Sequence, residues 1–120
     1  LEKIISDNKI DTVFTHYNED ANKDHVACHE IVTTAARHCQ NIITFKSNFY
    51  ITNKNFSPNF FVDISKNIEN KIKSLNCYHQ EHNRNNSLFE STIERNRVWG
   101  MSNHVKYAEA FLPIKLLQKG

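Results

Sequence analysis

The chain has 120 residues, of which 39% are hydrophobic and 11% aromatic, and its 15 basic and 13 acidic residues give a formal net charge of +2. This composition excludes an intrinsically disordered chain and is sufficient for one modest hydrophobic core. The nearly balanced charge, without a basic stripe, argues against nucleic acid as a partner. No apolar run in the sequence is long enough to span a bilayer.

The three cysteines, Cys28, Cys39 and Cys77, are an odd number without close spacing. This pattern argues against a disulfide framework and against a closed zinc knuckle. We therefore expect a reducing, cytoplasmic compartment, in which Cys28 and Cys39 pack as small apolar side chains.

The start of the chain predicts a helix followed by a buried strand. Residues 1–8 have the pattern of a helix tail, and because the chain begins there on Leu1, we expect it to be a fragment or a processed product. Residues 10–15 combine β-branched and aromatic side chains, which is typical of a buried strand in an α/β sheet.

A polar loop, a helix and a second strand are predicted next. Residues 16–24 are rich in acids and asparagine, and Asp24 is the expected N-cap of a helix that ends near His38. The predicted apolar face of this helix is Cys28, Ile31, Val32, Ala35 and Cys39. Residues 41–45 form a second short strand, so that strand, helix and strand make one parallel unit.

The second half of the sequence predicts a segment without regular secondary structure, followed by further helices and strands. Residues 46–59 read as irregular, residues 60–64 as a third extended segment, and Ser65 as the cap of a helix. The apolar positions of that helix are Ile68, Ile72 and Leu75.

A capping box marks the last predicted helix. After a polar loop at 79–86, Ser87 and Glu90 have the spacing that satisfies the first backbone amides of a helix, here ending near Gly100. Residues 107–111 predict a final strand, and Pro113 is expected to start a short terminal helix.

Histidine pairs are the clearest candidates for chemistry. His25 and His29 stand at i and i+4, which is the spacing of a metal pair but equally that of two half-exposed histidines, since no zincin-type glutamate lies between them. His79 and His82, three residues apart in a polar loop, are a weaker pair of the same kind.

Other candidates favour ordinary structural roles. Glu19 and Asp20 are interpreted as a solvated loop rather than an acid/base couple, and Cys28 as a core residue rather than a nucleophile. Gly100 and Gly120 are the only glycines, so the chain has no glycine-rich phosphate loop.

Several segments, spread in order over nearly the whole chain, share the pattern of one family. They are residues 13–16, 18–25, 56–65, 71 with 78–80, 97–100 and 107–111. Together they resemble the PIG-L/LmbE-type zinc-dependent N-acetylglucosaminyl deacetylases, whose second metal motif, Asp-x-His-x-Asp-His or a close variant, is similar to the stretch ending at His25.

The resemblance implies an α/β, Rossmann-like three-layer fold with a mostly parallel sheet, truncated at its N-terminus. Residues 1–120 would be the C-terminal portion of a single deacetylase domain. The implied activity is metal-dependent removal of N-acetyl groups from N-acetylglucosamine-type sugars or conjugates. The implied cofactor is Zn²⁺ or another divalent cation, and the implied partner is an amino sugar.

The resemblance also implies roles for single residues. His25 matches a metal ligand, Asp24 matches the acidic neighbour that orients it, and Asn22 stands where many members carry a histidine that steadies the transition state. The His-Pro-Asp-Asp motif that supplies the other ligands and the base is absent from the chain, so these ligands are expected upstream of Leu1.

Two alternatives stay open at this point. Arg97 and Glu109 match motif positions, but an ion pair between the last helix and the last strand would explain them equally well. The chain could also be a non-catalytic, degenerate member of the family that acts as a scaffold or interaction domain. As 120 residues alone, it is expected to be inactive.

Overall fold

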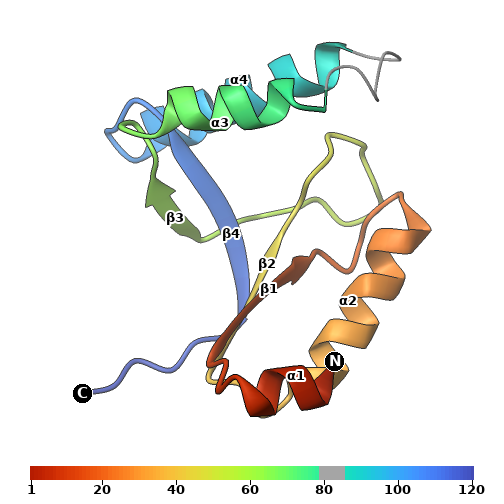
Figure 1. Ribbon diagram of the computed structural model, residues 1–120. Coiled ribbons are helices and arrows are strands. Elements are labelled where there is room, and N and C mark those ends of the chain that lie inside the picture. The colour runs from red at the N-terminus through yellow and green to blue at the C-terminus, as the bar shows by residue number, and fades with distance from the viewer. Residues whose placement is uncertain (79–85) are drawn as a thin grey trace. The chain divides into compact units, whose positions relative to one another are not determined.

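The computed structural model describes residues 1–78 and 86–120, with the backbone alone for residues 86–88. This part of the chain is α/β, with a sheet in the strand order β1-β2-β4-β3 (Figure 1). In chain order the elements are α1 (Glu2–Asp7), β1 (Thr12–His16), α2 (Lys23–Ala35), β2 (Asn41–Phe45), β3 (Phe60–Asp63), α3 (Ile68–Asn76), α4 (Asn86–Ser102) and β4 (Ala108–Lys115). The chain divides into two compact units, Leu1–Phe60 with Phe111–Gly120, and Phe61–Ala110.

The first unit contains the predicted strand–helix–strand arrangement. Strands β1 and β2 pair in parallel, in a register that runs from Thr12 opposite Asn41 to His16 opposite Phe45. Helix α2, which connects them, packs on β1 (Figure 1). The parallel unit expected from the sequence is therefore confirmed.

A small core lies between the helices and the strands of the first unit. Its fully buried members are Ala36, Cys39 and Ile42, and Ile5 of α1 and Val13 of β1 pack against them. Cys39 thus packs as expected, whereas Cys28 is only half-buried and Cys77 is exposed, and all three thiols are free.

The sheet is mixed, so the mostly parallel, three-layer arrangement expected from the resemblance is not confirmed. Strand β4 pairs antiparallel with β2, with Pro113 opposite Ile43. The terminal helix predicted to start at Pro113 is wrong, because Pro113 lies inside this strand. An irregularity of the register between Ile42 and Ile43 accompanies it, and such a bulge tolerates a residue that has no N–H to donate to the ladder.

Helix α2 begins and ends earlier than the sequence predicts. Its N-cap is Asn22 rather than Asp24, since the Asn22 side chain accepts a hydrogen bond from the Asp24 amide at 2.9 Å. The helix ends at Ala35, which leaves His38 and Cys39 beyond it. Ile31, placed on the predicted apolar face, is 62% exposed in the structure. That part of the prediction is wrong because the core is covered by the end of α2 and the residues after it.

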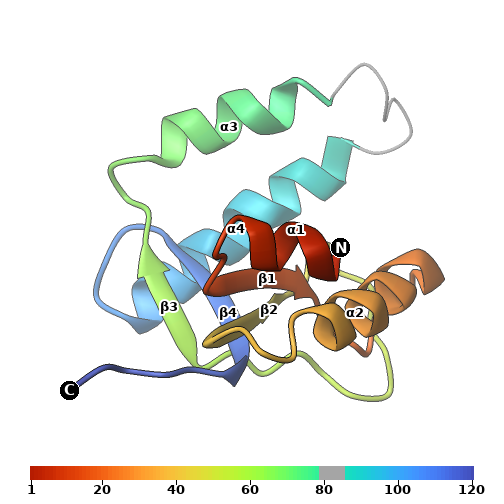
Figure 2. The same cartoon turned by 60° about the horizontal axis from the view of Figure 1, so that its bottom comes forward.

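The second unit contains α3 and α4, which lie side by side (Figure 2) and share a shallow apolar pocket lined by residues of both helices. Ser65 does not cap α3, whose N-cap is Asn67. Ser65 instead donates from its amide and hydroxyl to the Asp63 carboxylate, at 2.9 and 2.6 Å. Helix α4 begins at Asn86, so Ser87 lies inside the helix and not at the N-cap position that the predicted capping box requires. The side chain of Ser87 is not among those described. His79 and His82 lie outside the described residues.

The ion pairs of the second unit differ from the expected one. Glu109 of β4 pairs with Lys71 of α3, and Arg97 pairs with Glu94 one turn away on α4 at 2.9 Å. The ion pair between Arg97 and Glu109, which was one of two open alternatives, is therefore contradicted within the described residues, because each side chain pairs with another residue. Within the described residues, no helix combines the length and apolar character that crossing a membrane requires.

Candidate functional site

The candidate site lies where the two parallel strands of the first unit end. His16 and Phe45 are the last paired residues of β1 and β2, so the segments that follow them leave the sheet at the same edge. Ligand sites in α/β proteins commonly form at this edge. The two segments contact each other, since the Thr52 hydroxyl donates to the Glu19 carbonyl at 3.0 Å.

Asp20 is the centre of a buried hydrogen-bond network at this edge. Its side chain is fully buried. Oδ1 accepts from the Asn22 amide at 2.8 Å and from Nδ2 of Asn48 at 2.7 Å, and Oδ2 lies 3.1 Å from Nδ1 of His25. Burial alone would raise the pKa of this carboxyl, but the hydrogen bonds hold the pKa below its ordinary value. Asp20 is therefore an ionised acceptor.

His25, in the first turn of α2, has a ring that is held at one nitrogen and partly exposed. Nδ1 faces Asp20, and the flat face of the ring stacks on the ring of His16. The side chain of His25 is 24% exposed, and Nε2 has no hydrogen-bond partner among the described residues. The ring is thus held at one edge and one face, with Nε2 free to bind a cation or a ligand.

His16 and His29 complete a cluster of imidazoles. Nδ1 of His29 lies 2.7 Å from the carbonyl oxygen of His16, so His29 is tied to the backbone of β1. Burial, together with the nearby His25, lowers the pKa of His16. Nδ1 of His16 is buried without a hydrogen-bond partner among the described residues.

The residues of this cluster could supply some, but not all, of the ligands of a metal ion. Among residues 1–78 and 86–120, no three His, Cys, Asp or Glu side chains are placed to hold one ion together. A catalytic zinc usually has three protein ligands, and His25 offers one nitrogen without a hydrogen-bond partner among the described residues and a carboxylate behind the other nitrogen. His25 and His29, at i and i+4, are therefore not joined by a third such side chain within the described residues.

The other two predicted site residues lie just before His25 in the chain, and among the described residues no side-chain hydrogen bond joins either of them to the His25 ring. Asn22 uses its side-chain oxygen to cap α2, which leaves its Nδ2 group without a partner in the described chain. Asp24 is exposed, and its carboxylate has no partner among the described residues. Asp20, rather than Asp24, contacts the imidazole.

Three residues of this site were not predicted. Asp20 was interpreted as part of a solvated loop, and His16 and Asn48 had no assigned role. The spacing of Asp20 and Asn22 is that of a turn in which an aspartate accepts from the amide two residues on, and this signal could have indicated an ordered loop. No local pattern identifies Asn48, which is 28 residues away from Asp20 in the sequence.

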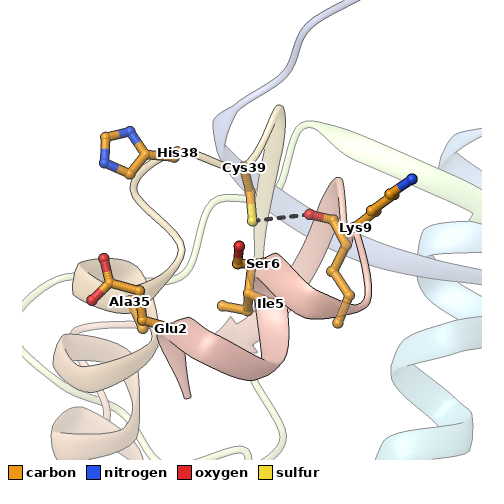
Figure 3. A pocket seen from close by; sticks show the side chains of 8 residues that line it. Glu2, Ile5, Ser6, Lys9, Ala35, His38 and Cys39 are labelled. Atoms are coloured by element: carbon orange, nitrogen blue, oxygen red, sulfur yellow. Dashed lines mark hydrogen bonds between the residues drawn. The ribbon is translucent and has the colours of Figure 1, made fainter.

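The pocket shown in Figure 3 lies elsewhere in the first unit. It has a volume of about 350 Å³ and is lined by residues of α1, by Lys9 and Ile10 after it, and by Ala35, His38 and Cys39. The Cys39 thiol in its wall donates to the carbonyl oxygen of Ile10 at 3.5 Å. His25 does not line this pocket, so the pocket is not part of the candidate site.

Solved structures share the fold of the chain, although no protein-family model matches it. A conserved protein from Thermus thermophilus matches with a TM-score of 0.79 and 19% identity over 99% of this chain and 58% of its own. A 4-carboxy-2-hydroxymuconate hydratase from Pseudomonas putida matches with a TM-score of 0.74 and 16% identity over 99% and 58%. An N,N′-diacetylchitobiose deacetylase from Pyrococcus horikoshii, complexed with an inhibitor, matches with a TM-score of 0.65 and 18% identity over 94% and 49%.

The fold is PIG-L/LmbE-like. At these identities the likeness concerns the fold alone, and a hydratase stands beside a deacetylase among the matches. The chain spans between 49% and 58% of the length of these proteins.

Proposed function

We propose that this chain is part of a metal-dependent hydrolase that removes N-acetyl groups from N-acetylglucosamine-type sugars or conjugates. His25 is the metal ligand that this chain contributes, and the remaining ligands come from residues outside these 120. The observation that carries the proposal is the free Nε2 of His25, backed at Nδ1 by the buried carboxylate of Asp20. A histidine that ligates zinc ordinarily donates its other ring N–H to a carboxylate, a backbone carbonyl or a water molecule, and here a carboxylate stands in that place.

The fold and the sequence pattern support the same activity. The segment ending at His25 resembles the second metal motif of the PIG-L/LmbE-type deacetylases, and a chitobiose deacetylase shares the fold. A divalent zinc ion, when bound in such a site, lowers the pKa of a water ligand and polarises the amide carbonyl.

Asn22 and Asp24 are proposed to act beside the ion. The free Nδ2 group of Asn22 is available to donate a hydrogen bond to the developing oxyanion, although it cannot supply a proton. The exposed Asp24 carboxylate sits in the first turn of α2 next to the ligand. Its proposed role is to adjust the electrostatics around His25 without direct contact.

The metal content of the full-length protein that contains this chain tests the proposal. Wild type is expected to bind about one equivalent of zinc, and His25→Ala is expected to lose it. Asp24→Asn is expected to weaken zinc binding by less than tenfold, because the carboxylate that meets Nδ1 of His25 is that of Asp20 and not that of Asp24. His38→Ala, which removes an exposed histidine beyond α2, is the matched control and is expected to retain the ion.

Activity is measured as acetate release from a panel of N-acetylglucosamine conjugates. Zinc-dependent release that is lost in His25→Ala supports the proposal. A wild-type protein that binds no zinc would contradict it and would favour the non-catalytic scaffold. Zinc retained in His25→Ala would equally show that the ligand has been assigned wrongly.

A further inference from the structure

The carboxylate of Asp20 has two sides with different partners. Oδ1 accepts from the Asn22 amide and from Nδ2 of Asn48, and Oδ2 faces Nδ1 of His25. The orientation of the Asn48 side chain is itself fixed, since its carbonyl oxygen accepts from the Tyr50 amide at 3.2 Å. The amino group of Asn48 therefore points at Asp20.

This geometry determines which nitrogen of His25 carries the proton. An ionised carboxylate can only accept hydrogen bonds, so the neutral imidazole satisfies Asp20 only as the Nδ1–H tautomer. That tautomer leaves the lone pair on Nε2, the nitrogen that has no hydrogen-bond partner among the described residues. A metal ion binds the nitrogen that carries the lone pair.

We infer that Asp20 and Asn48 are positioning residues that hold His25 in the Nδ1–H tautomer, with Asn48 fixing the carboxylate and the carboxylate fixing the ring. The inference rests on the proposed function for the identity of the bound cation, but the tautomer is a property of the metal-free protein. Asn48 is 6% exposed and comes from the segment between β2 and β3, so this segment takes part in the site through its hydrogen bond to Asp20.

Substitution of the carboxylate by an amide gives a sharp test. In Asp20→Asn the two donors that meet Oδ1, the Asn22 amide and Asn48, hold the new carbonyl oxygen on their side. The new amino group then faces His25 and donates to Nδ1, which moves the ring proton to Nε2. The variant has nearly the same shape as the wild type, so folding is expected to be preserved.

The tautomer is read from long-range ¹H–¹⁵N spectra of the His25 ring, recorded on the metal-free, full-length protein at about pH 8, where an ordinary histidine is neutral. Wild type is expected to show a protonated Nδ1 and an unprotonated Nε2. Asp20→Asn is expected to show the reverse, and its zinc dissociation constant is expected to rise about 10- to 100-fold.

Asn48→Ala tests the outer link. Without its donor the carboxylate can rotate, so the spectra are expected to show a mixture of the two tautomers, and zinc is expected to bind about tenfold more weakly. Asn41→Ala is the matched control. Asn41 also makes a side-chain hydrogen bond, to Thr12 at 3.0 Å, but at the opposite end of β1 and β2. It is expected to leave the His25 tautomer unchanged.

The results separate this inference from the proposed function. A wild-type ring protonated at Nε2, or an unchanged tautomer in Asp20→Asn, would overturn the inference even if zinc binds. An Asn48→Ala spectrum identical to that of Asn41→Ala would show that Asn48 does not influence the His25 tautomer. The predicted tautomers in a protein that binds no zinc would support the positioning and overturn the proposed function alone. If Asn48→Ala does not fold, Asp20→Asn decides.

Discussion

The imidazole rings of His16 and His25 stack face to face, with ring centroids 3.9 Å apart and planes inclined by 6°. His16 is the last residue of β1 and His25 lies in the first turn of α2, so the stack joins the end of the strand to the start of the helix. The His25 ring is therefore held on one face by stacking on His16 and at Nδ1 by the carboxylate of Asp20.

We predict that His16→Phe stabilises the protein by about 1 kcal/mol, because a phenyl ring keeps the stack and removes the buried Nδ1 atom that has no partner in the described chain. His16→Ala is expected to destabilise it, since the stacked ring is lost. The free energy of unfolding of the metal-free protein, measured in urea, checks both variants. A loss of stability in His16→Phe would mean that Nδ1 makes a hydrogen bond that the structure does not show.

Asn22 combines the cap of α2 with a proposed role in the reaction, and two substitutions separate them. Asn22→Ser keeps a side-chain oxygen that can cap the helix but removes the amide donor, so it is expected to retain stability and to lower acetate release. Asn22→Ala removes both groups and is expected to cost about 1 kcal/mol in addition. Denaturation and activity are measured on the same samples. Full activity in Asn22→Ser would exclude the amide from the reaction.

We predict that Gly100→Ala destabilises the protein by about 2 kcal/mol or more. A Cβ atom at this position would lie 2.6 Å from the carbonyl carbon and oxygen of Lys106 and 2.7 Å from the nitrogen of Tyr107. These are backbone atoms, which cannot move aside as a flexible side chain would. Met101→Ala, at a neighbouring position that is 65% exposed, is the control and is expected to change stability by less than about 0.5 kcal/mol. Equal effects of the two substitutions would show that α4 can shift to accept the methyl group.

The Asp63 carboxyl provides a test by pH in the second unit. Hydrogen bonds from the Ser65 hydroxyl and amide, with a smaller contribution from Lys66, lower the pKa of Asp63 below its ordinary value of 3.8. A carboxyl with a lowered pKa stabilises the folded state above pH 3.8, and this stabilisation is lost as the pH falls through the pKa of the folded state.

Ser65→Ala removes the hydroxyl donor and is expected to raise the pKa of Asp63 toward 3.8, so the stabilisation contributed by Asp63 becomes smaller and is fully lost at a higher pH. Carboxyl ¹³C titration of wild type and variant measures the change. Ser91→Ala, a hydroxyl lost elsewhere in the same unit, is expected to leave the Asp63 titration unchanged. An Asp63 pKa that is the same in Ser65→Ala and in wild type would contradict the assigned cause.

The local elements were predictable because they depend on neighbours in the sequence. The predicted strand at 41–45 coincides with β2, and the strand at 10–15 and the helix from Asp24 were displaced by only a few residues from β1 and α2. The position of His25 at the start of a helix follows from the same local signals. The role of His25 as a metal ligand stays a prediction, as do the roles of Asp24 and Asn22 beside it.

The errors arose where partners come from distant parts of the chain. Pro113 has the local signal of a helix start, but pairing with β2 places it in a strand. Arg97 and Glu109 find partners that the sequence does not indicate. Asp20 looks solvated next to Glu19, and it is buried because the segment after β2 covers it. Sequence periodicity carries no information about such tertiary contacts.

The network around Asp20 draws its members from stretches 28 residues apart, so it exists only when both stretches have reached their native places. In the unfolded chain the ring proton of His25 exchanges freely between Nδ1 and Nε2. Only the folded chain therefore holds the lone pair on Nε2. Any ion that selects this ring would accordingly act as a ligand of the native state and raise its melting temperature.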